Sequence, residues 1–145
     1  MRHYRCLPRK PISDGRFSLI TVQDDHIQII RQWRNAQMLV LRQSLPISEE
    51  QQTQYFDNVI WPTLEQTEPA NILLTFLDDG NAIGYGGLVH IAWEHRRAEV
   101  SFLLDQRFTH DQEKYNFYFS NYLSLLKKIA FDVLGFVRLF TETYD

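Results

Sequence analysis

Two side chains that can transfer protons, His90 and Glu99, flank a short turn in this sequence. If residues 93–96 form a four-residue loop with Ala92 opposite Arg97, His90 lies directly opposite Glu99 on the neighbouring strand. Their Cβ atoms are then about 5 Å apart on one face of a sheet. A carboxylate that near orients an imidazole, so the pair is a candidate general base, acting directly or through a water molecule. A register slip of one residue would separate the two side chains.

Each residue also has a purely structural interpretation. His90 fits an ordinary cross-strand neighbour, and Glu99, which follows two arginines, fits a surface residue in a salt bridge. The nearby Glu94 and His95 raise the question of a metal site, but their spacing matches no metal-ligand pattern and is typical of a solvated turn. We therefore expect no metal.

The composition predicts one globular domain without a membrane segment. The 145 residues are 44% hydrophobic and 23% charged, which suits a single core. No uncharged apolar stretch approaches the roughly 20 residues of a membrane span, and the first five residues lack the apolar segment of a secretory signal. The single cysteine, Cys6, excludes an internal disulfide. We expect a cytoplasmic protein with no membrane partner.

The charge pattern argues against binding to nucleic acid. The net charge is −3, whereas proteins that bind phosphate backbones usually carry a concentrated basic face. Residues 1–16 contain one basic cluster, but Pro8 and Pro11 interrupt it, and we expect a solvated N-terminal arm rather than an anion site. The members of the cluster are Arg2, Arg5, Arg9 and Lys10.

Strands and helices alternate in the hydrophobic pattern after this arm. Residues 17–22 have the β-branched and aromatic content of a strand, and Asp24 or Asp25 can cap a helix that runs to Asn35. Ser48 and Gln51 have the spacing of a capping box, which predicts the start of a second helix.

Three strands and a long helix follow, and then a last strand. Residues 72–77, 82–91 and 97–104 are expected to form an antiparallel meander. An amphipathic helix is predicted over 111–134 and a strand over 138–144. Because a helix that crosses between strands usually returns the chain in parallel, we expect an α/β fold with a mixed, mainly antiparallel sheet flanked by helices.

This order of elements resembles the GNAT superfamily of N-acetyltransferases as far as its fifth strand, over the single domain of residues 17–145. Residues 82–88, 97–104 and 130–139 are similar to its third strand, its fourth strand and the approach to its fifth strand. The last segment, with residues 33–35, most resembles RimJ/RimL-type and bacterial amino-sugar acetyltransferases. The resemblance implies that the family's last helix and hairpin are missing, that the chain is an incomplete catalytic unit, and that the last strand exposes an edge through which copies can pair.

The resemblance also implies acetyl transfer from acetyl-CoA to a primary amine. In this family the strand that carries Glu99 faces the thioester, which makes Glu99 the first candidate for the base, with His90 beside it. Backbone N–H groups of the same strand would bind the thioester carbonyl. The expected donor-contacting residues of this strand are Val100, Ser101, Phe102, Leu103 and Leu104.

The loop that should bind the CoA pyrophosphate departs from the family. The usual pattern is Arg/Gln-x-x-Gly-x-Gly/Ala, whereas residues 105–114 contain no glycine. Arg107, Lys114 and a helix N-terminus can hold phosphates through charge, although Asp111 and Glu113 would compete with an anion. The alternative is a non-catalytic GNAT-like module that binds CoA weakly or not at all.

Five residues are expected to line the acceptor pocket: Trp33, Arg34, Asn35, Arg42 and Tyr85. The arginines suit an anionic group such as the phosphate of a nucleotide sugar. We expect a small amine such as an amino sugar used in surface polysaccharide synthesis, with a protein N-terminus as the alternative acceptor. Trp33 equally suits a core position, and Arg34 a surface position.

Overall fold

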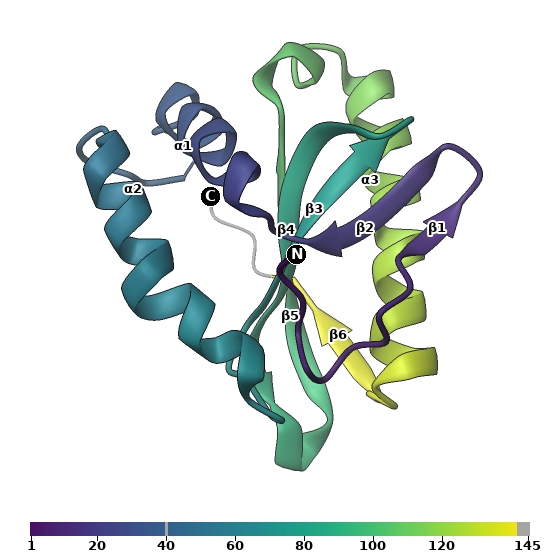
Figure 1. Cartoon of the computed structure of the whole chain (residues 1–145). Helices are drawn as coiled ribbons and strands as arrows, with labels where there is room; N and C mark the ends of the chain where they lie inside the picture. The colour runs from purple at the N-terminus through teal and green to yellow at the C-terminus, as the bar shows by residue number, and fades with distance from the viewer. Residues whose placement is uncertain (40, 142–145) are drawn as a thin grey trace.

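The computed structural model describes residues 1–39 and 41–141, and its centre is one six-stranded sheet (Figure 1). The strands follow one another across the sheet in chain order. Neighbours are antiparallel except for β5 and β6, which are parallel, so the expected mixed, mainly antiparallel sheet is confirmed. The strands are β1 (Ile12–Asp14), β2 (Phe17–Thr21), β3 (Ile72–Asp78), β4 (Asn81–Ala92), β5 (Arg97–Leu104) and β6 (Arg138–Phe140).

Helices cover both faces of the sheet, with α1 and α2 on one face and α3 on the other (Figure 1). α1 spans Ile27–Ala36, α2 spans Glu49–Tyr55 and α3 spans Gln112–Lys127. Wider helical turns at Phe56–Ile60 and Lys128–Val133 continue α2 and α3. The long helix expected over 111–134 is therefore present.

Local hydrogen bonds decide where the first two helices begin. Ser48 Oγ accepts the Gln51 N–H at 3.1 Å and Gln51 Oε1 accepts the Ser48 N–H at 2.9 Å, which confirms the predicted capping box. Before α1, however, Asp24 and Asp25 lie inside a short 3-10 turn that follows Gln23. The prediction that one of these aspartates caps the helix is therefore wrong.

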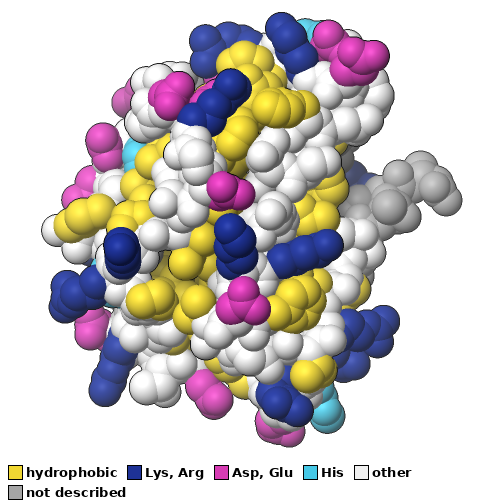
Figure 2. Space-filling view, turned by 90° about the vertical axis from the view of Figure 1, so that its right-hand side faces the viewer, with side chains coloured by type: hydrophobic (Ala, Val, Ile, Leu, Met, Phe, Trp, Pro, Cys, Tyr) yellow, Lys and Arg dark blue, Asp and Glu magenta, His cyan; other side chains and the backbone are white. Residues whose placement is uncertain are grey.

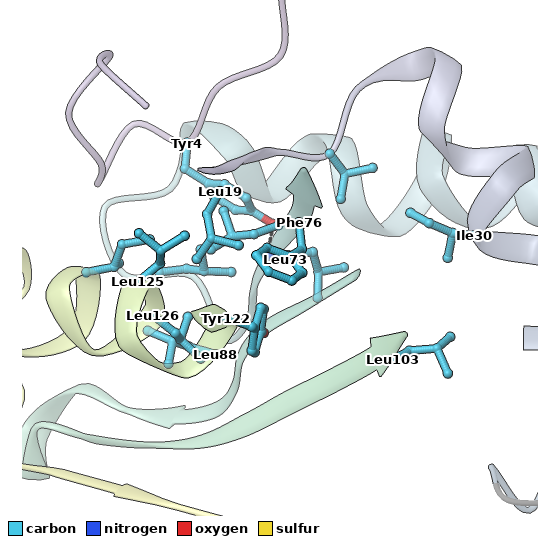
Figure 3. Packing of buried hydrophobic residues seen from close by; sticks show 14 of the residues in the cluster. Tyr4, Leu19, Ile30, Leu73, Phe76, Leu88, Leu103, Tyr122, Leu125 and Leu126 are labelled. Atoms are coloured by element: carbon cyan, nitrogen blue, oxygen red, sulfur yellow. Dashed lines mark hydrogen bonds between the residues drawn. The ribbon is translucent and has the colours of Figure 1, made fainter. Parts of the chain in front are cut away.

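The core has a layer on each side of the sheet. On the side of α3, Tyr122 and Leu126 are buried, and the Tyr122 ring centroid lies 5.5 Å from that of Phe76 on β3 (Figure 3). On the other side, Ile30 of α1 and Leu103 of β5 are buried. Because each such side chain contributes about 1.5–3 kcal/mol when it leaves water, these layers fix the helices on the sheet.

The first residues pack onto the domain, which corrects the expectation of a solvated arm. Tyr4 is 1% exposed, and its hydroxyl accepts the backbone N–H of Leu73 at 3.0 Å. Burial of this large ring, with a partner for its hydroxyl, holds the segment in place. The basic side chains lie at the surface, and the Arg2 guanidinium carbon is 4.2 Å from the centroid of the Trp61 ring.

β6 is the last strand of the sheet in the part of the chain described, and it is shorter than predicted. Thr141 was expected in the strand and lies outside it, and the rest of the expected strand and of its exposed edge, residues 142–144, lies outside the described residues. On the face that carries α3 and β1, acidic, basic and apolar side chains are interspersed (Figure 2).

Candidate active site

A β-bulge near the end of β4 brings His90 to Glu99. Val89 pairs with Glu99 and Ala92 pairs with Arg97, so two residues of β4 lie opposite one residue of β5. His90 has a φ of 49°, which is uncommon for a residue with a side chain, and its Nδ1 lies 3.0 Å from Glu99 Oε2. The predicted contact is present, but the predicted register is wrong, because Val89 is the direct partner of Glu99.

The two partners differ in their access to solvent. The His90 side chain is 75% exposed, whereas the Glu99 side chain is 11% exposed. An ionised Glu99 accepts a proton-bearing Nδ1, which leaves the lone pair of a neutral imidazole on Nε2, away from the carboxylate. The geometry therefore suits proton uptake at His90 with Glu99 behind it, which is one of the two role assignments that the sequence left open.

The side chains of β5 alternate between the two faces of the sheet, and the described pairing of β5 with the parallel strand β6 ends at Glu99. The Phe102 ring centroid lies 4.4 Å from that of Tyr122 on α3, whereas Leu103 is buried on the opposite face. Within the described residues, the pairing of β5 with β6 ends at Glu99, opposite Phe140. Glu99 thus makes the last β5–β6 pair within the part of the chain that the structure describes.

A groove of about 590 Å³ lies at the end of β5, next to the start of α3. Its wall is apolar near β5 and more polar towards α3. Three of the five predicted donor-contacting residues line it, and Val100 and Ser101 do not. The lining residues are Ala36, Gln37, Leu39, Leu41, Phe102, Leu103, Leu104, Gln106, Thr109, His110, Gln112 and Tyr115.

The predicted phosphate-binding residues are not part of the groove wall. The Arg107 guanidinium lies 2.9 Å from Asp105 Oδ2, and this carboxylate raises the pKa of the guanidinium. Lys114 is exposed on the first turn of α3. There the Asp111 carboxylate accepts the backbone N–H groups of Glu113 and Lys114. The N–H groups that a pyrophosphate would use are therefore bonded to a carboxylate of the protein itself.

The five residues predicted to line the pocket for the amine substrate have different environments. Burial raises the pKa of the Tyr85 hydroxyl, and the charge of Arg34 opposes this rise. Trp33 is 6% exposed and belongs to the core, which its large apolar ring favours over an open pocket. Asn35 Oδ1 accepts a backbone N–H from the loop after α1 at 2.8 Å. Arg42 is exposed in that loop, with a φ of 56°.

Comparison with known proteins decides the family. The model of the acetyltransferase (GNAT) domain matches residues 19–144. The chain belongs to the GNAT acetyltransferase family. It is therefore an acetyl-CoA-dependent N-acetyltransferase domain, as the sequence resemblance implied. No curated protein sequence matches this GNAT domain.

Solved structures agree with the GNAT fold. Spermidine N-acetyltransferase from Vibrio cholerae, in complex with CoA and spermine, is 14% identical with a TM-score of 0.69, over 88% of this chain and 71% of that chain. Its dodecameric form gives 0.63 at 14% identity, over 88% and 70%. An acetyltransferase from T. thermophilus gives 0.65 at 16% identity, over 92% and 66%.

Sequence reasoning missed part of the groove wall of this GNAT domain. Gln37 Nε2 donates to the Leu104 carbonyl at 2.8 Å and ties the segment after α1 to the end of β5. Tyr115 fits the apolar face of the amphipathic helix predicted over 111–134, and periodicity does not distinguish a residue of the core from one that lines a groove. The described His, Cys, Asp and Glu side chains form no group that could hold a metal ion. None of the helices described is long and apolar enough to cross a membrane.

Proposed function

We propose that this GNAT domain acetylates the primary amine of a small molecule, with His90 as the base and Glu99 as the residue that orients it. The observation that carries the proposal is the 3.0 Å contact between a buried carboxylate and an exposed imidazole. An ammonium group must lose a proton before its nitrogen can attack. A neutral imidazole is a suitable proton acceptor near pH 7.

The remaining groups of β5 are proposed to serve the acetyl donor, which supplies an activated thioester. The ammonium loses one proton to His90, the freed nitrogen forms a C–N bond to the carbonyl carbon, and the C–S bond breaks. The second proton lost by the nitrogen passes to the departing thiolate, so the products are the acetamide and the CoA thiol. Backbone N–H groups at Val100, Ser101 and Phe102 are the proposed donors to the carbonyl oxygen as its negative charge develops. Leu103 and Leu104 would contact the pantetheine arm.

The pyrophosphate of the donor is proposed to be held by charge, through Arg107 and Lys114. Asp111 opposes this binding, because its carboxylate is negative and already accepts two N–H groups at the helix start. Asp111→Asn keeps a good N-cap and removes the charge, so the affinity for CoA should rise about two- to fivefold. Arg107→Ala should weaken CoA binding, and added salt should weaken the binding of the wild type.

Isothermal titration with CoA measures these effects. An affinity that neither variant nor salt changes would contradict a charge-based grip. A wild-type domain that binds no CoA at all would refute the proposed grip and favour the non-catalytic module.

The acceptor is proposed to carry an anionic group, as an amino-sugar nucleotide does. The charge of Arg34 acts on the Tyr85 hydroxyl, and Arg42 lies in the loop that follows α1. The Vibrio cholerae enzyme was solved with spermine, a polycation, which arginines would repel. We therefore expect faster acetylation of an amino-sugar phosphate than of spermidine. Faster turnover of a peptide N-terminus than of either would favour the RimJ/RimL-type alternative.

Thiol release from acetyl-CoA with an accepted amine tests the catalytic assignment. Glu99→Gln and His90→Ala should each lower kcat by roughly 10² to 10⁴. His95→Ala, at an exposed histidine in the adjoining turn, is the matched control and should stay near the wild type. Activity within threefold of the wild type in both test variants would refute the assignment.

Pairing of copies through the edge at β6 is a further part of the proposal. β6 ends the described sheet, and one structure of the Vibrio cholerae enzyme is dodecameric. Sedimentation over a range of protein concentrations measures the association, and a monomer throughout would refute it.

A further inference from the structure

The segment before β3 holds the bulge of β4 through three hydrogen bonds. Asn71 Oδ1 accepts the backbone N–H of His90 at 3.1 Å, and the Ala70 carbonyl accepts the backbone N–H of Ile91 at 3.0 Å. The Pro69 carbonyl accepts the indole N–H of Trp93 at 2.8 Å. Three consecutive residues, which we call the 69–71 clamp, therefore bind the two bulged residues and the start of the turn.

The bulge decides on which face of the sheet His90 lies. The pairs from Gly84 with Leu104 to Val89 with Glu99 set a long register between β4 and β5. If β4 continued in that register without a bulge, His90 would lie opposite the next residue of β5, and its side chain would point to the face away from Glu99. The contact of the imidazole with Glu99 therefore requires the bulge.

The bulged conformation has a cost that a partner must offset. A φ of 49° at a residue with a side chain is disfavoured, and a bulge leaves an N–H without a ladder partner. Asn71 supplies the acceptor for that N–H at the strained residue itself. The clamp is anchored in turn, because the Trp93 ring lies edge-on to the buried Phe136, with centroids 5.2 Å apart.

We propose that Asn71 is a positioning residue for acetyl transfer, which acts by holding the backbone of His90 so that the imidazole meets Glu99. This inference rests on the proposed function of His90. Asn71 touches the His90 backbone and not the reacting atoms. Its loss should therefore misplace the base and leave intact the groove at the other end of β5, where Leu103 and Leu104 are proposed to contact the donor.

The test compares Asn71→Ala with Asn71→Asp, which keeps an oxygen acceptor, and with Asn58→Ala, a control at an exposed asparagine. For Asn71→Ala we expect kcat to fall roughly 10- to 100-fold, because a misplacement of about 1 Å costs that order of rate. KM for acetyl-CoA should stay within threefold, Asn71→Asp should recover most of kcat, and Asn58→Ala should match the wild type. Trp93→Phe loosens the clamp at a second point while keeping an aromatic ring, and should lower kcat less.

A second readout does not depend on activity. ¹⁵N NMR distinguishes the two tautomers of a neutral histidine ring. A hydrogen bond to an ionised Glu99 requires the ring proton of His90 to lie on Nδ1. In Asn71→Ala this bond should be lost, and the tautomer with the proton on Nε2 should become more populated. An unchanged tautomer together with an unchanged kcat in Asn71→Ala would overturn the proposal. If the tautomer changes while Glu99→Gln and His90→Ala keep full activity, the placement of His90 by Asn71 is supported and its catalytic role is refuted.

Discussion

Gly86 on β4 lies where the sheet meets α3 with no room for a side chain. A Cβ atom at this position would lie 2.1 Å from the Ser101 carbonyl oxygen and 2.6 Å from the Tyr122 hydroxyl. The φ of Gly86 is outside the left-handed region, so alanine would meet only a steric barrier there. The Tyr122 hydroxyl donates to the same Ser101 carbonyl, so one methyl group disturbs both the strand spacing and this hydrogen bond.

The expected cost of Gly86→Ala follows from these distances. Ordinary contact begins near 3.4 Å, so the β5 backbone would have to move by more than 1 Å. Overpacking of this kind costs about 1–3 kcal/mol, and loss of the Tyr122 hydrogen bond adds about 0.5–1.5 kcal/mol. We expect the free energy of unfolding to fall by about 2–4 kcal/mol and Tm to fall by about 10 °C.

Urea and thermal unfolding of a glycine series check this value. Gly84→Ala places its Cβ 3.2 Å from the Leu103 carbonyl oxygen, so a small adjustment suffices and the loss should stay near or below about 1 kcal/mol. Gly80→Ala meets open space but has a φ of 82°, and it should cost about 1–2 kcal/mol through backbone conformation alone. Gly86→Ala should be the most destabilised of the three. A loss below that of Gly80→Ala, or under about 0.5 kcal/mol, would refute the steric reasoning.

Two further predictions concern side chains that bond to β3, the strand next to Gly86. Tyr4→Phe removes the buried acceptor of the Leu73 N–H and should lower the free energy of unfolding by about 1–3 kcal/mol in urea, whereas an unchanged value would show that the hydroxyl contributes nothing. Burial lowers the pKa of His26, whose Nδ1 accepts the N–H of Gln23 and contacts Thr75 Oγ1. His26 therefore binds a proton more readily in the unfolded chain than in the folded one. Its contribution to the free energy of unfolding is fully present above about pH 6.5 and is lost as the pH falls below that value. Between pH 8 and pH 5, the Tm of His26→Asn should change less than the Tm of the wild type. An equal change of Tm in the two proteins would contradict this prediction.

Local rules explain why much of the fold could be predicted from the sequence. The capping box of Ser48 and Gln51 needs only a short segment, and the meander follows from apolar alternation between turn residues. Tyr4 was missed because its burial depends on Leu73, which lies far away in the sequence. A short basic segment gives no sign that one aromatic residue will enter the core, so the expected arm was assigned by its charges.

The candidate site shows the same division between local and distant causes. The loop at 93–96 and the pair of Ala92 with Arg97 follow from the sequence and are present in the structure. The bulge depends on hydrogen-bond acceptors in the segment before β3, and no sequence pattern within β4 predicts it. The contact of His90 with Glu99 was thus expected from a regular ladder and is made by an irregular one.

The donor end of the site shows how structural capping can oppose ligand binding. In a glycine-rich loop the backbone N–H groups at the helix start have no side-chain partner until phosphate arrives. Here Asp105 and Asp111 accept backbone N–H groups before and at the start of α3, and Asp105 also pairs with Arg107. These carboxylates stabilise the turn by about 1 kcal/mol for each cap, and a pyrophosphate must either displace them or bind beside them. On the proposal that the pyrophosphate binds at this helix end, binding of the donor is an exchange of anions there, so the charge at Asp111 should control the affinity for CoA more than the shape of the loop.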